Sequence, residues 1–188
     1  MKHIIVCGTD RVGKGTLIKG LTDTAENYTV RHFGYPKGNT DDEKMIFQHS
    51  FFKREFKIST NRNTLLEINN SDLLIWDRSH IGENVYGVLY RQTNPEQWVF
   101  QLEEEFGIDK DPEVYLVLLV APAEFICKRD DGESFTSDIV KKQIEIDLFI
   151  KAFTESKIQN KLLLNVSDGE NYISKDELLE SVLRFIKQ

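Results

Sequence analysis

The chain has 188 residues, 40% of them hydrophobic, and its 31 acidic and 24 basic residues give a net charge of −7. This acidic balance argues against a nucleic-acid polymer as the main ligand, because a protein that binds a phosphate backbone needs a basic surface. The length is sufficient for one well-buried core, and the chain contains no Pro/Gly-rich stretch that would act as a linker. We therefore expect a single domain over residues 1–188.

Two further features restrict where the protein works. The chain has only 2 cysteines, Cys7 and Cys127, which are too few for a disulfide framework and favour a reducing compartment. The longest apolar run, Val114 to Ala121, is too short to span a bilayer. We expect a cytoplasmic protein without a membrane partner.

Apolar runs and helical stretches alternate along the chain. The runs fit buried parallel strands at 3–7, 28–33 (a weak signal), 72–76, 113–120 and 161–166. Helical character is found at 14–25, 41–58, 82–91, 95–106, 122–129, 137–156 and 174–187. This alternation predicts an α/β three-layer fold with a five-stranded parallel sheet and right-handed crossovers. Ligands bind such sheets at the carboxyl ends of the strands, so the loops that follow the strands are the candidate site.

The loop after the first predicted strand reads Gly-Thr-Asp-Arg-Val-Gly-Lys-Gly-Thr over 8–16. Glycines let successive N–H groups surround an oxyanion, Lys14 adds a positive charge, and the following helix directs its N-terminus at the phosphates. The common pattern G-x-x-x-x-G-K-[ST] is not met, because Gly15 takes the last position and the hydroxyl moves to Thr16. A phosphate-binding loop (P-loop) is predicted, with a nucleotide site that includes Gly8, Arg11, Val12, Gly13, Lys14, Gly15 and Thr16.

The third predicted strand ends in Asp77, followed at once by Arg78. A carboxylate at the end of an apolar strand is the arrangement that places an acid beside a P-loop metal ion. Asp77 is therefore expected to hold Mg²⁺ directly or through water, together with Thr16. The planar guanidinium of Arg78 is suited to clamping a phosphate.

These motifs resemble the thymidylate kinase and deoxynucleoside kinase branch of the P-loop kinases, and the short chain is similar to deoxynucleotide kinases of bacteriophages. The resemblance rests on Thr9-Asp10-Arg11-x-Gly13-Lys14, on Asp77-Arg78-Ser79 with Tyr86 downstream, and on the strand at 114–118 leading to Pro122 and Lys128-Arg129. It implies a host-cytoplasm location if the chain comes from a phage. Relatives are commonly homodimers, so a homodimer is a further expectation.

The resemblance also implies roles for individual residues. Arg11 would reach the transferring phosphoryl group, and Asp10 would approach the sugar 3′-hydroxyl of the acceptor. Arg78 would bind the acceptor phosphate, with Lys37 as a second basic contact in place of the family's arginine. Arg129 would lie in a short lid over about 129–138 and contact the donor.

Three other residues complete the predicted site. Ser167 belongs to the loop expected to border the donor base, and Tyr86 is assigned to the acceptor. On the predicted helix at 41–58, one of Phe47, Phe51 and Phe52 is expected to touch the acceptor base, and rough alignment favours Phe47.

The sequence therefore predicts ATP-dependent, Mg²⁺-assisted phosphorylation of a deoxynucleoside monophosphate, either dTMP or several dNMPs. An alternative is a deoxynucleoside kinase, whose acceptor is a sugar 5′-hydroxyl and benefits from a carboxylate base. A third possibility is a nucleotide-binding regulatory module that transfers no phosphate. No Asn-Lys-x-Asp base-reading segment of the GTPase kind is present.

Overall fold

The computed structural model describes residues 1–61, 72–130, 132 and 134–187. The strands are β1 (Lys2–Cys7), β2 (Tyr28–His32), β3 (Leu73–Asp77), β4 (Val114–Val120) and β5 (Asn160–Asn165). The α-helices in the described residues are α1 (Lys14–Asp23), α2 (Asp41–Thr60), α4 (Glu83–Arg91), α5 (Glu96–Glu105), α6 (Ala123–Cys127), α7 (Ile139–Glu155) and α8 (Lys175–Phe185). A short 3-10 helix, η1 (His80–Gly82), precedes α4.

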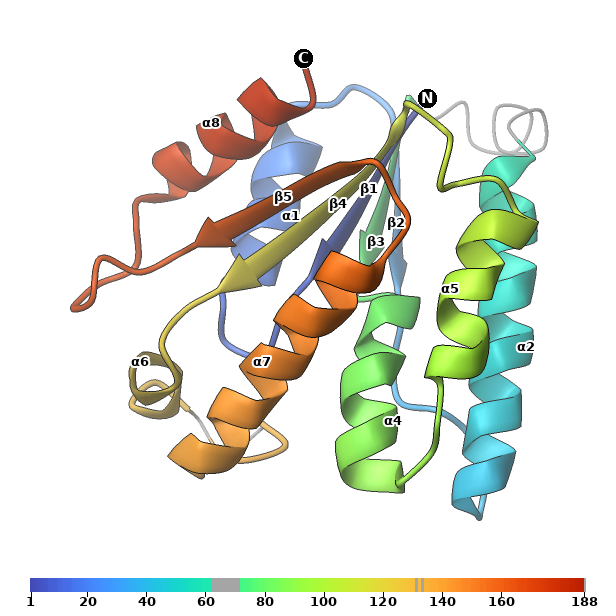
Figure 1. Ribbon diagram of the computed structural model, residues 1–188. Coiled ribbons are helices and arrows are strands. Elements are labelled where there is room, and N and C mark those ends of the chain that lie inside the picture. Colours follow the sequence, from blue (N-terminus) through green and yellow to red (C-terminus); the bar gives the residue numbers. More distant parts are fainter. Residues whose placement is uncertain (62–71, 131, 133, 188) are drawn as a thin grey trace.

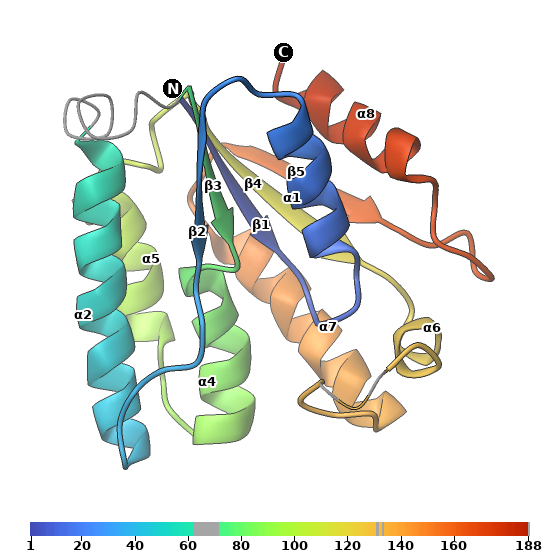
Figure 2. The same cartoon turned by 180° about the vertical axis from the view of Figure 1, so that it is seen from behind.

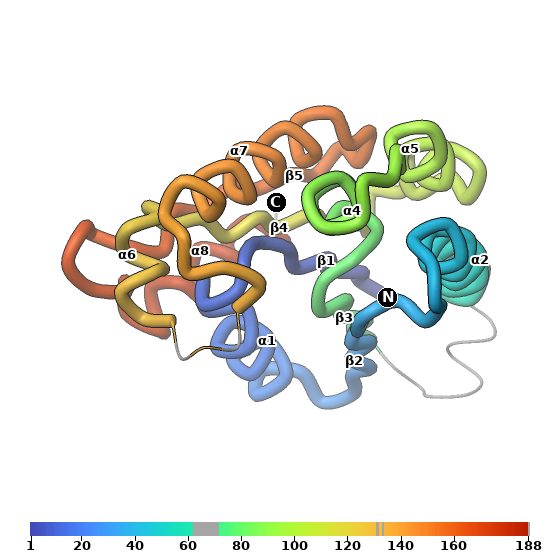
Figure 3. Tube along the Cα trace, turned by 90° about the horizontal axis from the view of Figure 1, so that it is seen from below, coloured from blue at the N-terminus to red at the C-terminus, as the bar shows by residue number. Residues whose placement is uncertain are grey.

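The five strands form one parallel sheet in the order β2-β3-β1-β4-β5. Helices α1 and α8 cover one face, whereas α2, α4, α5 and α7 lie on the other (Figures 1 and 2). Figure 3 views the molecule along the sheet and separates the same two layers of helices. The predicted three-layer α/β fold with a five-stranded parallel sheet is confirmed.

The sheet is buried on both faces because its central strands are apolar on both. In β1, Ile4 and Val6 pack into a hydrophobic cluster with α1 and α8, while Ile5 and Cys7 pack into a second cluster with α2, α4 and α7. A strand that alternates between two apolar layers must be hydrophobic throughout, which explains why the runs in the sequence are continuous.

The sheet order determines where the P-loop lies. Strand β1 is central, with β3 on one side and β4 on the other, and each is paired in parallel register. The carboxyl ends of these three strands therefore meet at one edge, and the loops after β1 and β3 are neighbours although 69 residues separate Gly8 from Asp77 in sequence. Arg78 N–H donates to the Val6 carbonyl at 3.0 Å, which fixes the two loops together.

All five predicted strands and seven predicted helices are present, with ends that differ by a few residues. An element that was not predicted, the 3-10 helix η1, precedes α4. In the part of the chain that the structure describes, no helix has both the length and the apolar character needed to cross a membrane. The predicted lid at about 129–138 includes residues 131 and 133, which lie outside the described residues.

Candidate functional site

The loop between β1 and α1 contains several residues with positive φ angles, a conformation that favours glycine. Gly8 has φ 139°, and a Cβ there would lie 2.4 Å from the Leu119 carbonyl oxygen. Gly13 has φ 84° and forms the N-cap of α1 in the left-handed region. Arg11 also has a positive φ, 66°, which is uncommon for a residue other than glycine. The loop therefore turns tightly, and helix α1 begins immediately after Gly13.

Lys14 lies inside this loop. Its ammonium donates to the main-chain carbonyls of Thr9 at 2.6 Å and Gly8 at 3.1 Å, and it is 4.0 Å from the Asp10 carboxylate. Burial lowers the pKa of Lys14 from 10.5 to about 8; Asp10 opposes this shift and Arg78 adds to it. A cation held in this way is available to an anion that enters the loop.

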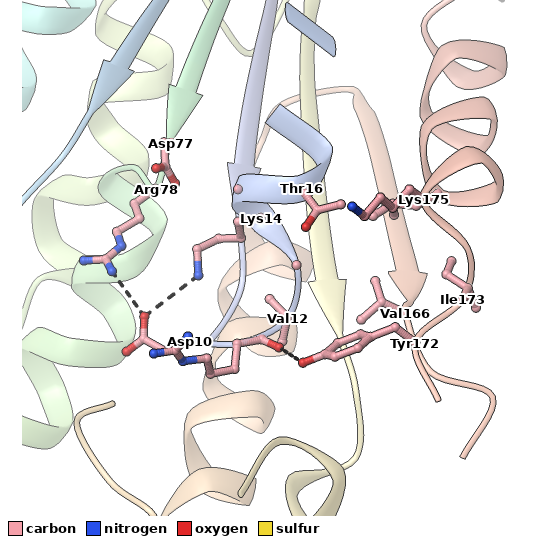
Figure 4. Close-up of a pocket in the computed structure, with 14 residues that line it drawn as sticks. Asp10, Val12, Lys14, Thr16, Asp77, Arg78, Val166, Tyr172, Ile173 and Lys175 are labelled. Atoms are coloured by element: carbon pink, nitrogen blue, oxygen red, sulfur yellow. Dashed lines mark hydrogen bonds and ion pairs between the residues drawn. The ribbon is translucent and has the colours of Figure 1, made fainter. Parts of the chain in front are cut away.

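A pocket of about 570 Å³ opens above the loop. One side consists of residues 10–16 with Asp77 and Arg78, and the other consists of Val166, Tyr172, Ile173, Lys175 and Leu178. Figure 4 shows Lys175 and Thr16 pointing toward one another from α8 and α1. The pocket thus has a polar, partly cationic side and a second side that is mostly apolar apart from Tyr172 and Lys175, and its volume suits a ligand the size of a nucleotide.

Arg78 connects the P-loop to the segment after β3. Its guanidinium donates to Asp10 Oδ1 at 3.2 Å (Figure 4), and its backbone has φ 69°. The next residues are anchored in the interior, because His80 Nε2 lies 2.8 Å from Glu103 Oε1 and both side chains are fully buried. Arg78 is therefore held at the sheet edge by a fixed backbone.

Asp77 has a partner that the sequence analysis did not identify. His32, at the end of the neighbouring strand β2, has Nδ1 2.7 Å from Asp77 Oδ2. The two residues are paired in the register of β2 and β3, so their side chains meet at the carboxyl edge of the sheet. This contact orients the carboxylate that lines the large pocket.

A second, smaller pocket of about 60 Å³ lies on the other side of Arg78, which lines both pockets. Its polar wall is a buried network: Gln48 Nε2 donates to Glu83 Oε1 at 2.8 Å, and Arg91 Nη2 donates to Glu83 Oε2 at 2.5 Å. Burial raises the pKa of Glu83, whereas Arg91 and Gln48 act in the opposite direction. The aromatic side chains that line this pocket are Phe33, Tyr35, Phe52, Tyr86, Phe135 and Phe149.

Several predicted site residues meet at these two pockets. Residues 10–16, Asp77 and Arg78 line the first pocket, and Gly8 and Tyr86 line the second. Thr16 and Asp77 therefore face the same space, and both present oxygen atoms, the ligand type that Mg²⁺ prefers. Among the described residues no group of three or more His, Cys, Asp or Glu side chains is arranged around a metal position.

Four predicted residues line neither pocket. Phe47 stacks on Phe51 with ring centroids 5.7 Å apart, and Lys37 is an exposed residue of the turn after β2. Ser167 is buried, with its hydroxyl accepting from Gly169 N–H at 2.9 Å. Arg129 lies with its guanidinium 3.7 Å from the Phe125 ring centroid.

The reason for the position of Phe47 is the phase of helix α2. The buried positions of this helix are Gln48, Phe52, Glu55, Phe56 and Ser59, which repeat at helical spacing. Phe47 falls beside this stripe, and Gln48 falls on it. The same periodicity in the sequence could have identified Gln48, which belongs to no recognisable motif.

Other residues that line the two pockets belong to no recognisable sequence motif. Tyr172, Ile173, Lys175 and Leu178 follow β5, beyond the short loop that the sequence analysis associated with the donor base. Arg91 is the last residue of α4 and reaches the second pocket only because α4 packs beside α2 and α7. These residues can be assigned to the site only from the tertiary structure, which brings separate helices and loops together.

No protein-family model matches this sequence, and no curated protein matches it. Solved structures do match. The YorR protein from Bacillus subtilis, whose structure is described as a complex with phosphorylated GDP, is 15% identical with a TM-score of 0.64, over 98% of this chain and 95% of that one. Thymidylate kinase from Candida albicans is 15% identical with a TM-score of 0.63, over 99% of this chain and 91% of that one.

The parallel sheet, the glycine-rich loop after β1 and the two pockets at the sheet edge define a P-loop fold. More specifically, the chain has the fold of the thymidylate-kinase-like P-loop kinases, and the match spans nearly the whole of both solved structures. The predicted fold class is confirmed in this form.

Proposed function

We propose that this protein transfers the γ-phosphoryl group of ATP to a deoxynucleoside monophosphate. The observation that carries the proposal is the arrangement of two pockets that share Arg78, one built on the P-loop and the other on aromatic and polar side chains. Phosphoryl transfer requires a donor and an acceptor in line, and two pockets that meet at a cationic side chain support the assignment of one pocket to each.

The large pocket is assigned to the donor. Lys14 would bind the donor phosphates, and Arg11 would stabilise the charge that spreads over the transferring group. Asp77, oriented by His32, and the Thr16 hydroxyl would hold Mg²⁺. When bound, the ion would neutralise negative charge on the donor phosphates. The apolar side chains of Val166, Ile173 and Leu178 would receive the donor base or sugar.

The small pocket is assigned to the acceptor. Its aromatic walls suit a planar base, and the Gln48 amide beside Glu83 and Arg91 can exchange hydrogen bonds with the base edge. Arg78 would hold the acceptor phosphate in line with the donor. Ligand pockets span roughly 300 Å³ or more, so acceptor binding requires the exposed aromatic side chains Tyr35 and Phe135 to move outward.

The test is ADP production from Mg-ATP with dTMP, dCMP, dGMP and dAMP offered separately, and with the matching nucleosides. We expect turnover with at least one monophosphate. Turnover with nucleosides alone would instead identify a deoxynucleoside kinase, and ATP binding without turnover would identify a regulatory module.

The variant Arg78→Gln distinguishes a monophosphate acceptor from a nucleoside acceptor. In a monophosphate kinase it removes the contact with the acceptor phosphate and should raise the KM for that acceptor by roughly 10- to 100-fold, as expected for a lost charge-assisted bond. A nucleoside acceptor carries no phosphate, so its KM should change little. Arg184→Gln is the matched control, because Arg184 is exposed near the end of α8 and lines neither pocket.

A further inference from the structure

The loop after β5 is a closed hairpin. Asp168 Oδ1 accepts the N–H groups of Glu170 at 2.9 Å and Asn171 at 2.7 Å, and Asp168 N–H donates to the Asn171 carbonyl at 3.1 Å. An antiparallel bridge joins Ser167 to Tyr172. Because these hydrogen bonds fix the backbone of the loop, the hairpin presents Tyr172 in a defined direction.

Tyr172 contacts three parts of the donor site. Its hydroxyl donates to the main-chain carbonyl of Arg11 in the P-loop (Figure 4). Its ring stands edge-on to Phe125 with centroids 4.8 Å apart, and the Arg129 guanidinium lies 5.6 Å from its centroid. The ring also lines the large pocket. One side chain thus joins the P-loop, the end of α6 and the β5–α8 loop.

The peptide that Tyr172 contacts follows a residue with an uncommon backbone conformation. Arg11 has φ 66°, a left-handed conformation that a non-glycine residue keeps only when its surroundings hold it there. Rotation about the φ and ψ bonds of Arg11, which would relax this conformation, would redirect both the Arg11 side chain and the Val12 N–H. A hydrogen bond to the Arg11 carbonyl opposes that rotation. Burial raises the pKa of Tyr172, so the hydroxyl keeps the proton that it donates.

We propose that Tyr172 is a positioning residue, whose hydroxyl fixes the Arg11 peptide and thereby aims the Arg11 guanidinium at the transferring phosphoryl group. This inference rests on the proposed function, in which Arg11 stabilises developing charge. It assigns to a residue of the β5–α8 loop a role in the chemical step, in addition to a wall of the donor pocket.

The first experiment uses Tyr172→Phe, which removes the hydroxyl and keeps the ring. The single-turnover rate of phosphoryl transfer should fall roughly fivefold, the effect of one hydrogen bond, while the KM for ATP changes less than about twofold because the ring still lines the pocket. Tyr28→Phe is the matched control, since Tyr28 is exposed on edge strand β2 and lines neither pocket. An unchanged rate in Tyr172→Phe would overturn the inference.

A double-mutant cycle with Arg11→Ala separates positioning from general stability. If Tyr172 acts through the Arg11 side chain, Tyr172→Phe should have no further effect on the rate once that side chain is absent. An equal loss in both backgrounds would mean that Tyr172 acts independently of Arg11, which refutes the proposal.

A spectroscopic measurement needs no turnover and therefore separates failure of this inference from failure of the proposed function. In ¹⁵N-labelled protein, Tyr172→Phe should shift the amide resonance of Val12, which shares a peptide with the Arg11 carbonyl, and Tyr28→Phe should leave it in place. An unmoved Val12 resonance in Tyr172→Phe overturns the contact. A wild-type protein without turnover overturns only the assigned chemistry, provided that the Val12 shift is found.

Discussion

Replacing Lys14 with methionine is expected to stabilise the ligand-free protein and to weaken nucleotide binding. Methionine has a similar length and can occupy the same buried volume without a charge. Lys14 is only 8% exposed. The substitution therefore tests whether the protein keeps a buried cation for binding at a cost in stability.

The size of the effect follows from the pKa of Lys14, which burial lowers from 10.5 to about 8. At about 1.4 kcal/mol per pH unit, this difference corresponds to roughly 3 kcal/mol that charging the amine costs the folded state at neutral pH. Methionine loses the two hydrogen bonds to the Gly8 and Thr9 carbonyls, at about 1 kcal/mol each. The net gain should be about 1 kcal/mol, which raises Tm by roughly 2–4 °C in a chain of this size.

The pH dependence has a definite sign. Because the folded pKa of Lys14 is lowered, the unfolded chain binds more protons between pH 8 and 10.5, and this group's contribution to wild-type stability rises over that window. Below about pH 8 the amine is charged in both states, and its full cost to stability is present. A matched pH series of the Lys14→Met variant should lack this component.

Thermal unfolding by circular dichroism at pH 7 to 10, without nucleotide, is the assay for stability. Calorimetric titration with Mg-ADP measures binding, and its Kd should rise roughly 100-fold in the variant as a charged contact is lost. Lys19→Met is the control, because Lys19 is exposed on α1 and pairs only with Asp23 among the described residues. A Lys14→Met protein that melts below the wild type, or that binds Mg-ADP equally well, would refute the reasoning.

Three further predictions concern the loop and the small pocket. Gly8→Ala places a methyl group 2.4 Å from the Leu119 carbonyl oxygen at a positive φ, so we expect a lower Tm and loss of Mg-ADP binding, and a normal titration would contradict this close approach. Glu83→Gln leaves the buried Arg91 guanidinium without its carboxylate and should lower the free energy of unfolding by about 3 kcal/mol in urea titrations, a result that an unchanged midpoint would disprove. Gln48→Leu should raise the KM for the acceptor at least fivefold while the KM for ATP stays constant; equal changes in both would show that Gln48 does not belong to the acceptor pocket.

The acceptor side of the site illustrates the limit of sequence reasoning. Its polar wall joins Gln48 of α2 to Glu83 and Arg91 of α4, and no short motif contains all three. Their meeting depends on which face α2 turns toward α4, and a helical phase error of one residue exchanges Gln48 for Phe47. The periodicity of one helix predicts which of its residues form the buried face. Which helix packs against that face is decided by the tertiary structure.

By itself, the sequence determined the five strands, the parallel α/β architecture and the P-loop. Each of these depends on residues that are contiguous in the chain: a buried parallel strand must be apolar throughout, and a phosphate cradle needs its glycines and lysine within one turn. Tertiary structure alone decided the strand order, the His32–Asp77 pair and the contact of Tyr172 with Arg11, which are 161 residues apart. Contacts between distant residues arise only when separate elements are packed against one sheet, because local propensity does not encode which loops will become neighbours.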